Sequence, residues 1–468
     1  MKNTLIKIAL FLLIFTTSCS DFLEENPKSI VSPETILNSV DGFDLTLTGI
    51  YSHISGWGNL YGWNPYFLYE GFVDFQDSPD TFSVGNILPN DYALNQSWRL
   101  FYSMINTSNL IIKNIDAIEG SKEKNRIEGE AKFIRAWSYF SLVQFYGDVP
   151  LITEPVSDPP SFQPSRTDQV EVYNQIVKDM KDAVDMLENE APTPTRVNKW
   201  VAKGFLTKIY LTMSGNPNNI DMFEGESTAQ LALNQAIDII NSERYSINIP
   251  YEDVFFTDND AETIWEIRTT SNRIGNVMPY LTQQMFRPTD EFSATFESTD
   301  IRGPLWGIST SYDYNGTTYT FPKPTYLKFI DKESFSNQLQ FQSELSITAL
   351  RYADVLLMAA EADNEVNNGP SSSAYEWINA VRNRAGIDNL SDLDYSSFKD
   401  AVFFERRHEL YGEGFSWWDL KRFNKFSLFN NVSRTLVTPI DDHLNYFPIY
   451  EVELITNPNM TQNPGWPE

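Results

Sequence analysis

The sequence is poor in the two residue types that build most metal sites. Its 468 residues include one cysteine and three histidines. Zinc and most transition-metal centres draw several ligands from these types, so the composition excludes most such centres. A single cysteine also excludes any disulfide within the chain. The fold must therefore be held by its hydrophobic core.

Basic residues are scarce as well. The chain has 35 Lys and Arg against 63 Asp and Glu, a net charge of -28, and no Lys/Arg run longer than two. Nucleic-acid binding depends on neutralising phosphates with such residues, so nucleic acid is excluded as a ligand. What the chain does have is 41% apolar residues, with 32 Phe, 23 Tyr and 11 Trp. That share predicts a globular protein with a large core.

The amino terminus carries the one pronounced apolar run. Lys2 and Lys7 precede Ile8 to Phe15, which is far shorter than the roughly 20 residues of a membrane-spanning helix. The run is therefore interpreted as an export signal, residues 1–18, removed on maturation. Cys19 follows at the expected cleavage position and resembles a bacterial lipobox cysteine, although Ser18 replaces the commoner Gly or Ala. We expect lipidation at Cys19; an ordinary signal peptide with a stray thiol is the alternative.

The rest of the chain shows helical periodicity broken by long loops. Apolar residues recur at helical spacing, and large aromatics alternate with Ala at the expected contacts. The pattern predicts a mostly α fold of tetratricopeptide-like helix pairs, an α-α superhelix, with long loop-rich insertions and short β-hairpins. Residues 19–468 are expected to form one body, divided into 19–242, a loop-rich insertion at 243–346, and 347–468. The helices are expected at 106–118, 129–145, 172–187, 202–213, 231–240, 350–364, 375–385 and 398–410.

One hairpin can be placed by its turn. Asn315-Gly316 is a strong two-residue turn signal because both residues tolerate positive φ. The turn pairs Tyr314 with Thr317 and Tyr312 with Tyr319, so the three tyrosines share one face. That face is expected either to bind ligand or to pack on the body as core.

A Gly-rich loop at residues 56–69 gathers aromatic and polar side chains. Flat rings beside amides and carboxylates suit a sugar, whose apolar faces stack on the rings while its hydroxyls are hydrogen-bonded. Simple packing within the loop is the alternative. Asp74, Asp77 and Asp80 follow and could hold Ca²⁺, with a solvated loop as the alternative. The predicted ligand-binding residues are Trp57, Tyr61, Trp63, Tyr66, Trp306, Tyr312 and Tyr314.

A charged helix raises the question of an enzyme. Glu405 and Glu409 share a face, as a paired-carboxylate or metal site requires. His408 lacks a second His four residues away, so a zinc-protease motif is excluded. Ion pairs with neighbouring helices are the simpler expectation. No nucleophile elbow or phosphate-binding loop occurs, so we expect no catalytic role, no metal and no cofactor; a glycoside hydrolase remains the enzymatic alternative.

Several segments together resemble the SusD/RagB family. They run in order through nearly the whole mature chain, with His408 and Ser416 standing where Arg is common in the family. The segments are Ser18 to Leu23, Gly129 to Trp137, Phe145 to Leu151, Arg351 to Ala362, Asn379 to Gly386, Glu405 to Arg422 and Phe447 to Trp466.

The resemblance implies a surface-exposed outer-membrane lipoprotein of Bacteroidota. Such a protein binds a nutrient, usually a glycan, and caps a SusC-like TonB-dependent transporter without a catalytic role. Peptide capture occurs in part of the family and stays open as the alternative. Binding residues vary within the family, so no motif position is carried over as a ligand contact.

Overall fold

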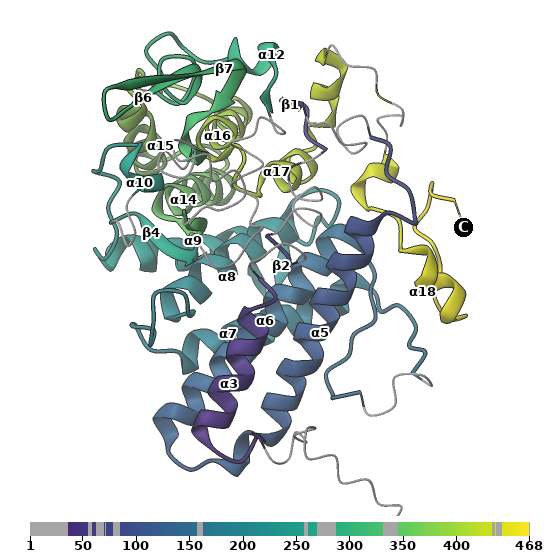
Figure 1. The fold of residues 1–468 in the computed structure, drawn as a ribbon. Coiled ribbons are helices and arrows are strands. Elements are labelled where there is room, and N and C mark those ends of the chain that lie inside the picture. Colours follow the sequence, from purple (N-terminus) through teal and green to yellow (C-terminus); the bar gives the residue numbers. More distant parts are fainter. Residues whose placement is uncertain are drawn as a thin grey trace, which may run out of the picture.

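The computed structural model describes residues 36–54, 59–61, 70, 72–77, 85–156, 162–256, 261–268, 287–330, 345–432, 436 and 442–467. Helices dominate this part of the chain (Figure 1). They are α3 (Val40–Tyr51), α5 (Tyr92–Asn114), α6 (Ser121–Tyr146), α7 (Gln169–Met186), α8 (Lys199–Ser214), α9 (Thr228–Asn241), α10 (Asp253–Phe256), α12 (Asp290–Ser293), α14 (Tyr352–Asn367), α15 (Ser372–Ala385), α16 (Tyr395–Leu410), α17 (Ser416–Arg422) and α18 (Glu451–Thr456). The strands are β1 (Gln76–Asp77), β2 (Met222–Phe223), β3 (Glu226–Ser227), β4 (Thr263–Ile267), β5 (Arg287–Pro288), β6 (Ile308–Tyr314), β7 (Thr317–Tyr326) and β8 (Ile347–Arg351).

The long helices pack in a ladder. Each of α5 to α9 contacts the next along the chain, α9 contacts α14, and α14 contacts both α15 and α16. The predicted mostly α fold of helix pairs is thus confirmed. The predicted helix starts were less accurate, because polar capping residues set them rather than apolar periodicity. The expected helix at 106–118, for example, begins at Tyr92, where the side chain of Asp91 accepts the amide N–H of Ala93 at 2.9 Å.

A cluster of rings at the centre of the ladder joins α6 to its neighbours. Phe133 on α6, Phe205 on α8 and Trp265 on β4 meet edge to face, with centroids 5.5 to 5.7 Å apart. Such pairs contribute about 0.5–1.5 kcal/mol each beyond their burial. The indole N–H of Trp265 donates to the carbonyl of Thr195 at 3.2 Å. The cluster therefore fixes α6, which the sequence predicted to be buried, at the centre of the core.

The loop-rich insertion is closed at its base by a small sheet. β4 and β8 pair antiparallel, from Thr263 opposite Arg351 to Ile267 opposite Ile347. The two ends of the insertion are thereby held together directly before α14, and the helix ladder continues across the gap through the α9–α14 contact. Within the insertion the hairpin β6–β7 projects at the upper left of the molecule (Figure 1). None of the described helices is long and apolar enough to cross a membrane.

Candidate ligand-binding site

The hairpin β6–β7 presents a row of aromatic rings. Its register pairs Tyr314 with Thr317 and Tyr312 with Tyr319, as the turn predicted, and Asn315 and Gly316 have φ of 50° and 77°. The Tyr312 ring stacks on Tyr319 at 5.1 Å and on Phe321 at 5.7 Å, with interplanar angles of 13° and 20°. The register confirms that Tyr312, Tyr314 and Tyr319 share one face, and Phe321 joins them there.

This aromatic face belongs partly to a core and partly to the surface. Tyr312 and Phe321 are buried in a small hydrophobic cluster separate from the main core. Trp306, Tyr314 and Tyr319 pack against that cluster but are only half-buried. Trp306 is also steadied by an edge-to-face contact with Tyr251 at 5.9 Å. Three rings thus remain accessible on a support that restricts their motion.

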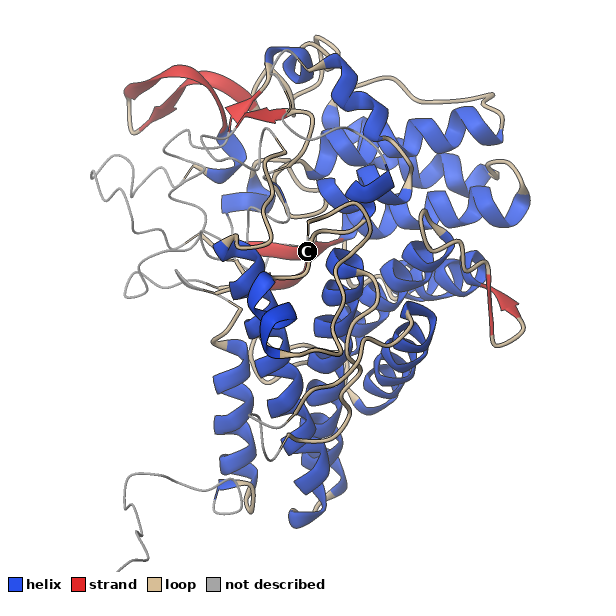
Figure 2. Cartoon of the chain, turned by 90° about the vertical axis from the view of Figure 1, so that its right-hand side faces the viewer, coloured by secondary structure: helices blue, strands red, loops and turns tan. Residues whose placement is uncertain are grey.

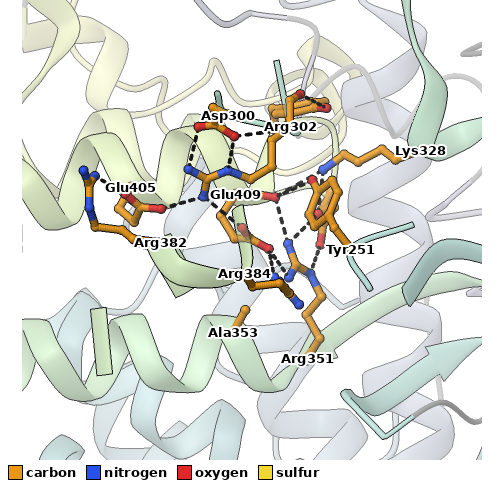
Figure 3. A network of polar contacts seen from close by, with 12 residues as sticks. Tyr251, Asp300, Arg302, Lys328, Arg351, Ala353, Arg382, Arg384, Glu405 and Glu409 are labelled. Atoms are coloured by element: carbon orange, nitrogen blue, oxygen red, sulfur yellow. Dashed lines mark hydrogen bonds and ion pairs between the residues drawn. The ribbon is translucent and has the colours of Figure 1, made fainter. Parts of the chain in front are cut away.

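The hairpin is rooted in a buried network of ion pairs (Figure 3). Arg302, just before β6, pairs with Glu405 at 2.5 Å and Glu409 at 3.0 Å on α16. Lys328, just after β7, pairs with Glu413 at 2.7 Å. Both ends of the hairpin are therefore tied to α16 and the turn that follows it.

The network balances its charges. Glu405 pairs with two cations and Glu409 with three. Arg382 and Arg384 on α15 are the expected partners from a neighbouring helix, whereas Arg302 comes from a turn and Arg351 from β8. Its core has five cations and five carboxylates: Arg302, Lys328, Arg351, Arg382 and Arg384 with Glu262, Asp300, Glu405, Glu409 and Glu413. Arg382 also pairs with Glu297, whose side chain is 53% exposed at the edge of the network. Equal numbers of opposite charges allow this many ionised groups to be buried together.

Two groups of the network show how burial and pairing compete. Burial alone would raise the pKa of Glu409, but Arg384, Arg351 and Arg302 outweigh it and hold the pKa well below the ordinary value. Burial lowers the pKa of Lys328 to about 8, and Glu413 opposes the shift. Glu409 is thus a permanent anion that organises arginines, and no proton exchange is expected of it near neutral pH.

Two acids anchor the segment that follows the aromatic loop. Oε1 of the fully buried Glu70 accepts the amide N–H groups of Gly414 at 2.7 Å and Phe415 at 3.0 Å, and the hydroxyl of Ser416 at 3.0 Å. Burial raises the pKa of Glu70 to about 7 against these hydrogen bonds. Asp74 forms a bidentate ion pair with Arg407 on α16, in which Nη2 of Arg407 donates to Oδ2 of Asp74 at 2.7 Å.

The loop end and the hairpin meet over the same helices. β1 pairs with β5, Gln76 opposite Pro288, and β5 in turn contacts β7. Segments far apart in the sequence, 70–77, 287–288 and 302–328, therefore converge on α16 and α17 at the top of Figure 1. We call this region the aromatic end. Among the described residues, no group of three His, Cys, Asp or Glu is arranged to hold a metal ion.

Comparison with known proteins agrees with this architecture. A family model described as SusD family matches residues 260–466, and one described as starch-binding associating with outer membrane matches residues 21–211. The SusD-like protein P25 of Formosa agariphila is 27% identical, with 90% of each chain covered. The chain is a member of the SusD/RagB-like family.

Solved structures show the same SusD fold. A SusD superfamily protein from Parabacteroides distasonis aligns with a TM-score of 0.80 and 25% identity over 93% of this chain and 100% of its own. A structure named as a putative sugar binding protein, from Bacteroides vulgatus, aligns with a TM-score of 0.73 and 22% identity over 92% and 99%. The helix ladder of this SusD-like chain is therefore shared with the family along almost its whole length.

The predicted binding residues of the SusD-like chain divide into three groups. Tyr61 is buried in the main core and lines a small internal cavity of about 40 Å³. Tyr312 is buried in the hairpin's own cluster, while Trp306 and Tyr314 are half-buried on it. Trp57, Trp63, Tyr66 and the lipidation candidate Cys19 lie outside the described residues, as does Asp80 of the considered calcium site.

Sequence reasoning missed the residues that support the site. Tyr319 was placed on the tyrosine face but not counted among the ligand-binding residues. Arg302 and Lys328 were not singled out, although two cations flanking an aromatic hairpin are a visible signal for anchorage. Arg407 was taken as part of a charged helix, and nothing in its spacing pointed to Asp74, 333 residues away.

Proposed function

We propose that this SusD-like chain binds a nutrient glycan, an oligo- or polysaccharide, at the aromatic end. The observation that carries the proposal is the set of half-buried rings, Trp306, Tyr314 and Tyr319, fixed on one hairpin face that is rooted in α16. Rings held in place lose little freedom on binding, and their faces suit the apolar faces of sugar rings. Trp57, Trp63 and Tyr66, outside the described residues, stay predicted ligand contacts from the sequence.

The charge distribution supports a neutral glycan. The chain carries a net charge of -28, which repels acidic polysaccharides. Two arginines of the aromatic end are paired, Arg407 with Asp74 and Arg302 with Asp300, Glu405 and Glu409, whereas the buried Nε of Arg287 on β5 has no hydrogen-bond partner among the described residues. The paired arginines add no net positive charge there, and Arg287 is a single cation in a chain with a large excess of acids.

In this proposal the chain captures and delivers, and has no catalytic role. Acyl chains on Cys19 hold it at the outer surface of the outer membrane, since several chains on one lipoprotein anchor stably. The bound glycan is passed to a SusC-like TonB-dependent transporter. Support comes from the family membership, from the sequence at the amino terminus, and from the sugar binding named for the Bacteroides vulgatus neighbour.

Affinity electrophoresis tests the proposal directly. The chain from Ser20 onward is run through gels containing plant, fungal and host glycans, together with Trp306→Ala and Tyr314→Ala variants. Tyr92→Ala is the matched control, because Tyr92 is exposed on α5 away from the hairpin. Retardation by one glycan that the hairpin variants lose and the control keeps supports the proposal. Binding of oligopeptides with no response to any glycan would replace it by peptide capture.

A further inference from the structure

A second, larger cavity lies away from the aromatic end. Its volume is about 1190 Å³, and it is lined by residues of α5, of 150–156, of 162–164 and of the region of α18. Figure 2 shows the side of the molecule on which α5 and α18 lie. None of the residues named above at the aromatic end lines it. Small-molecule sites usually measure about 300–1,000 Å³. The size of this groove therefore suits a ligand of several linked units.

Two aromatic rings on α5 lie at this groove, and the half-buried Tyr102 offers the more accessible face, because Trp98 is only 5% exposed and belongs to the main core. Trp98 and Tyr102 are four residues apart on the helix, and their centroids lie 5.0 Å apart with an interplanar angle of 48°. The Trp98 indole is held by an edge contact with Tyr146 at 5.1 Å. The Tyr102 hydroxyl donates to the carbonyl of Pro150 at 2.9 Å. Both rings are thus fixed before any ligand arrives.

A third ring and several polar groups complete the lining. Phe162 comes from a different segment and is 42% exposed, so its ring is available for contact. Oδ1 of Asn106, the next turn of α5, accepts the amide N–H of Val156 at 2.9 Å, which leaves the side-chain NH₂ as a donor. Ser103 is exposed beside it. Burial lowers the pKa of His53, so its neutral ring offers one donor and one acceptor.

The groove is close to neutral in a strongly acidic chain. The 20 lining residues that the structure describes include one arginine, Arg99, and one carboxylate, Glu453, whereas the whole chain has a net charge of -28. A neutral lining among so many acids favours an uncharged ligand, because a charged one would lack a counter-charge within the groove.

The backbone of the groove disfavours an extended peptide. Peptides that bind as an added strand need free backbone donors and acceptors. Here the carbonyl of Pro150 accepts from Tyr102, the carbonyl and N–H of Ile152 bond Asn109 and Tyr139, and the N–H of Val156 bonds Asn106. What remains is aromatic faces with side-chain donors and acceptors, the combination that recognises sugar rings and their hydroxyls.

We propose that this groove is a second carbohydrate-binding site, which takes a neutral oligosaccharide of several sugar units. The ligand class is the one proposed for the aromatic end, but the residues are independent. The failure of either site can therefore be distinguished from the failure of the other.

The test is calorimetry of the full chain from Ser20 onward with a panel of neutral hexasaccharides, namely α- and β-linked glucans, a xylan fragment and a mannan fragment. It is run on the Trp306→Ala background to remove the aromatic end. Ser103→Trp places a bulky side chain in the groove from an exposed position, and Phe162→Ala removes an exposed ring. Phe404→Ala is the matched control, since Phe404 is 40% exposed outside the groove.

One hexasaccharide should bind the Trp306→Ala protein. Ser103→Trp should abolish that binding, Phe162→Ala should weaken it about three- to tenfold, as expected for one ring contact, and Phe404→Ala should leave it unchanged. Unfolding temperatures close to the parent's would show that the variants fold. The proposal is overturned if no hexasaccharide binds the Trp306→Ala protein, if Phe162→Ala and Ser103→Trp bind as the parent does, or if oligopeptides occupy the groove instead.

Discussion

Replacing Arg302 by methionine should destabilise the chain far more than replacing an exposed cation. The Arg302 side chain is fully buried and donates to Asp300 at 2.9 and 2.8 Å, to Glu405 at 2.5 Å and to Glu409 at 3.0 Å. In the variant, Glu405 would still pair with Arg382, and Glu409 would still pair with Arg351 and Arg384. Asp300, 1% exposed, would lose its cation. Removing one partner of a buried pair in this way costs about 3–5 kcal/mol.

Lys181→Met provides the matched control. Lys181 and Glu224 lie 2.7 Å apart, but their side chains are 46% and 62% exposed. Water screens such a pair, so its loss should cost at most about 1 kcal/mol. Urea unfolding followed by tryptophan fluorescence measures both variants, and hydrogen exchange over 308–326 reports on the hairpin. If Arg302→Met lowers the free energy of unfolding as little as the control does, and hydrogen exchange in the hairpin is unchanged, the network does not hold the aromatic end in place.

Three further changes test the fold and the anchors. Gly316→Ala should lower the free energy of unfolding by about 1–2 kcal/mol, because φ is 77° at this position. Gly49→Ala, in the helix α3 and with equally open space around the new Cβ, should raise it by about 0.5–1 kcal/mol. Equal effects of the two changes in urea unfolding would contradict the turn assignment. Gly307→Ala should destabilise by about 1–3 kcal/mol, since its Cβ would collide with the backbone carbonyl of Arg302, and a neutral effect on thermal unfolding would argue against that close approach. Burial raises the pKa of Glu70 to about 7 in the folded chain, so the folded state binds this proton more tightly than the unfolded state. The stability that this gives is fully present below about pH 4.5 and is lost as the pH rises through 7. Wild type should therefore lose up to about 3 kcal/mol relative to Glu70→Gln between pH 4.5 and 8, and a stability difference independent of pH would count against this account.

Local signals in the sequence sufficed for much of the fold and for one part of the site. Asn315-Gly316 fixed the hairpin register, because side chains alternate faces in a strand once the turn is known. Helical periodicity located the ladder from α5 to α16 but misplaced starts such as that of α5, which begins at Tyr92 behind its cap Asp91 and not at Asn106. The short helices α17 and α18 were not expected, since one or two turns show too little periodicity.

Long-range pairings could not be predicted from spacing. Arg302 meets Glu409 across 107 residues, and Glu70 meets the amide of Gly414 across 344. From the sequence alone, many different arginines or amides could pair with each of these acids, and only the folded structure shows which one does. Trp98, Tyr102 and Asn106 form a stripe at every fourth residue that was visible in the sequence. Its meaning required knowing that this side of α5 borders a cavity.

Calorimetry of the chain from Ser20 onward with one responding glycan tests whether the rings of the hairpin bind sugar. The wild type should give measurable binding heat, Trp306→Ala should bind the glycan clearly more weakly, and Tyr92→Ala should bind it with unchanged affinity. Binding that Trp306→Ala and Tyr314→Ala both leave intact, or binding of oligopeptides but of no glycan, would contradict the proposed role of these rings.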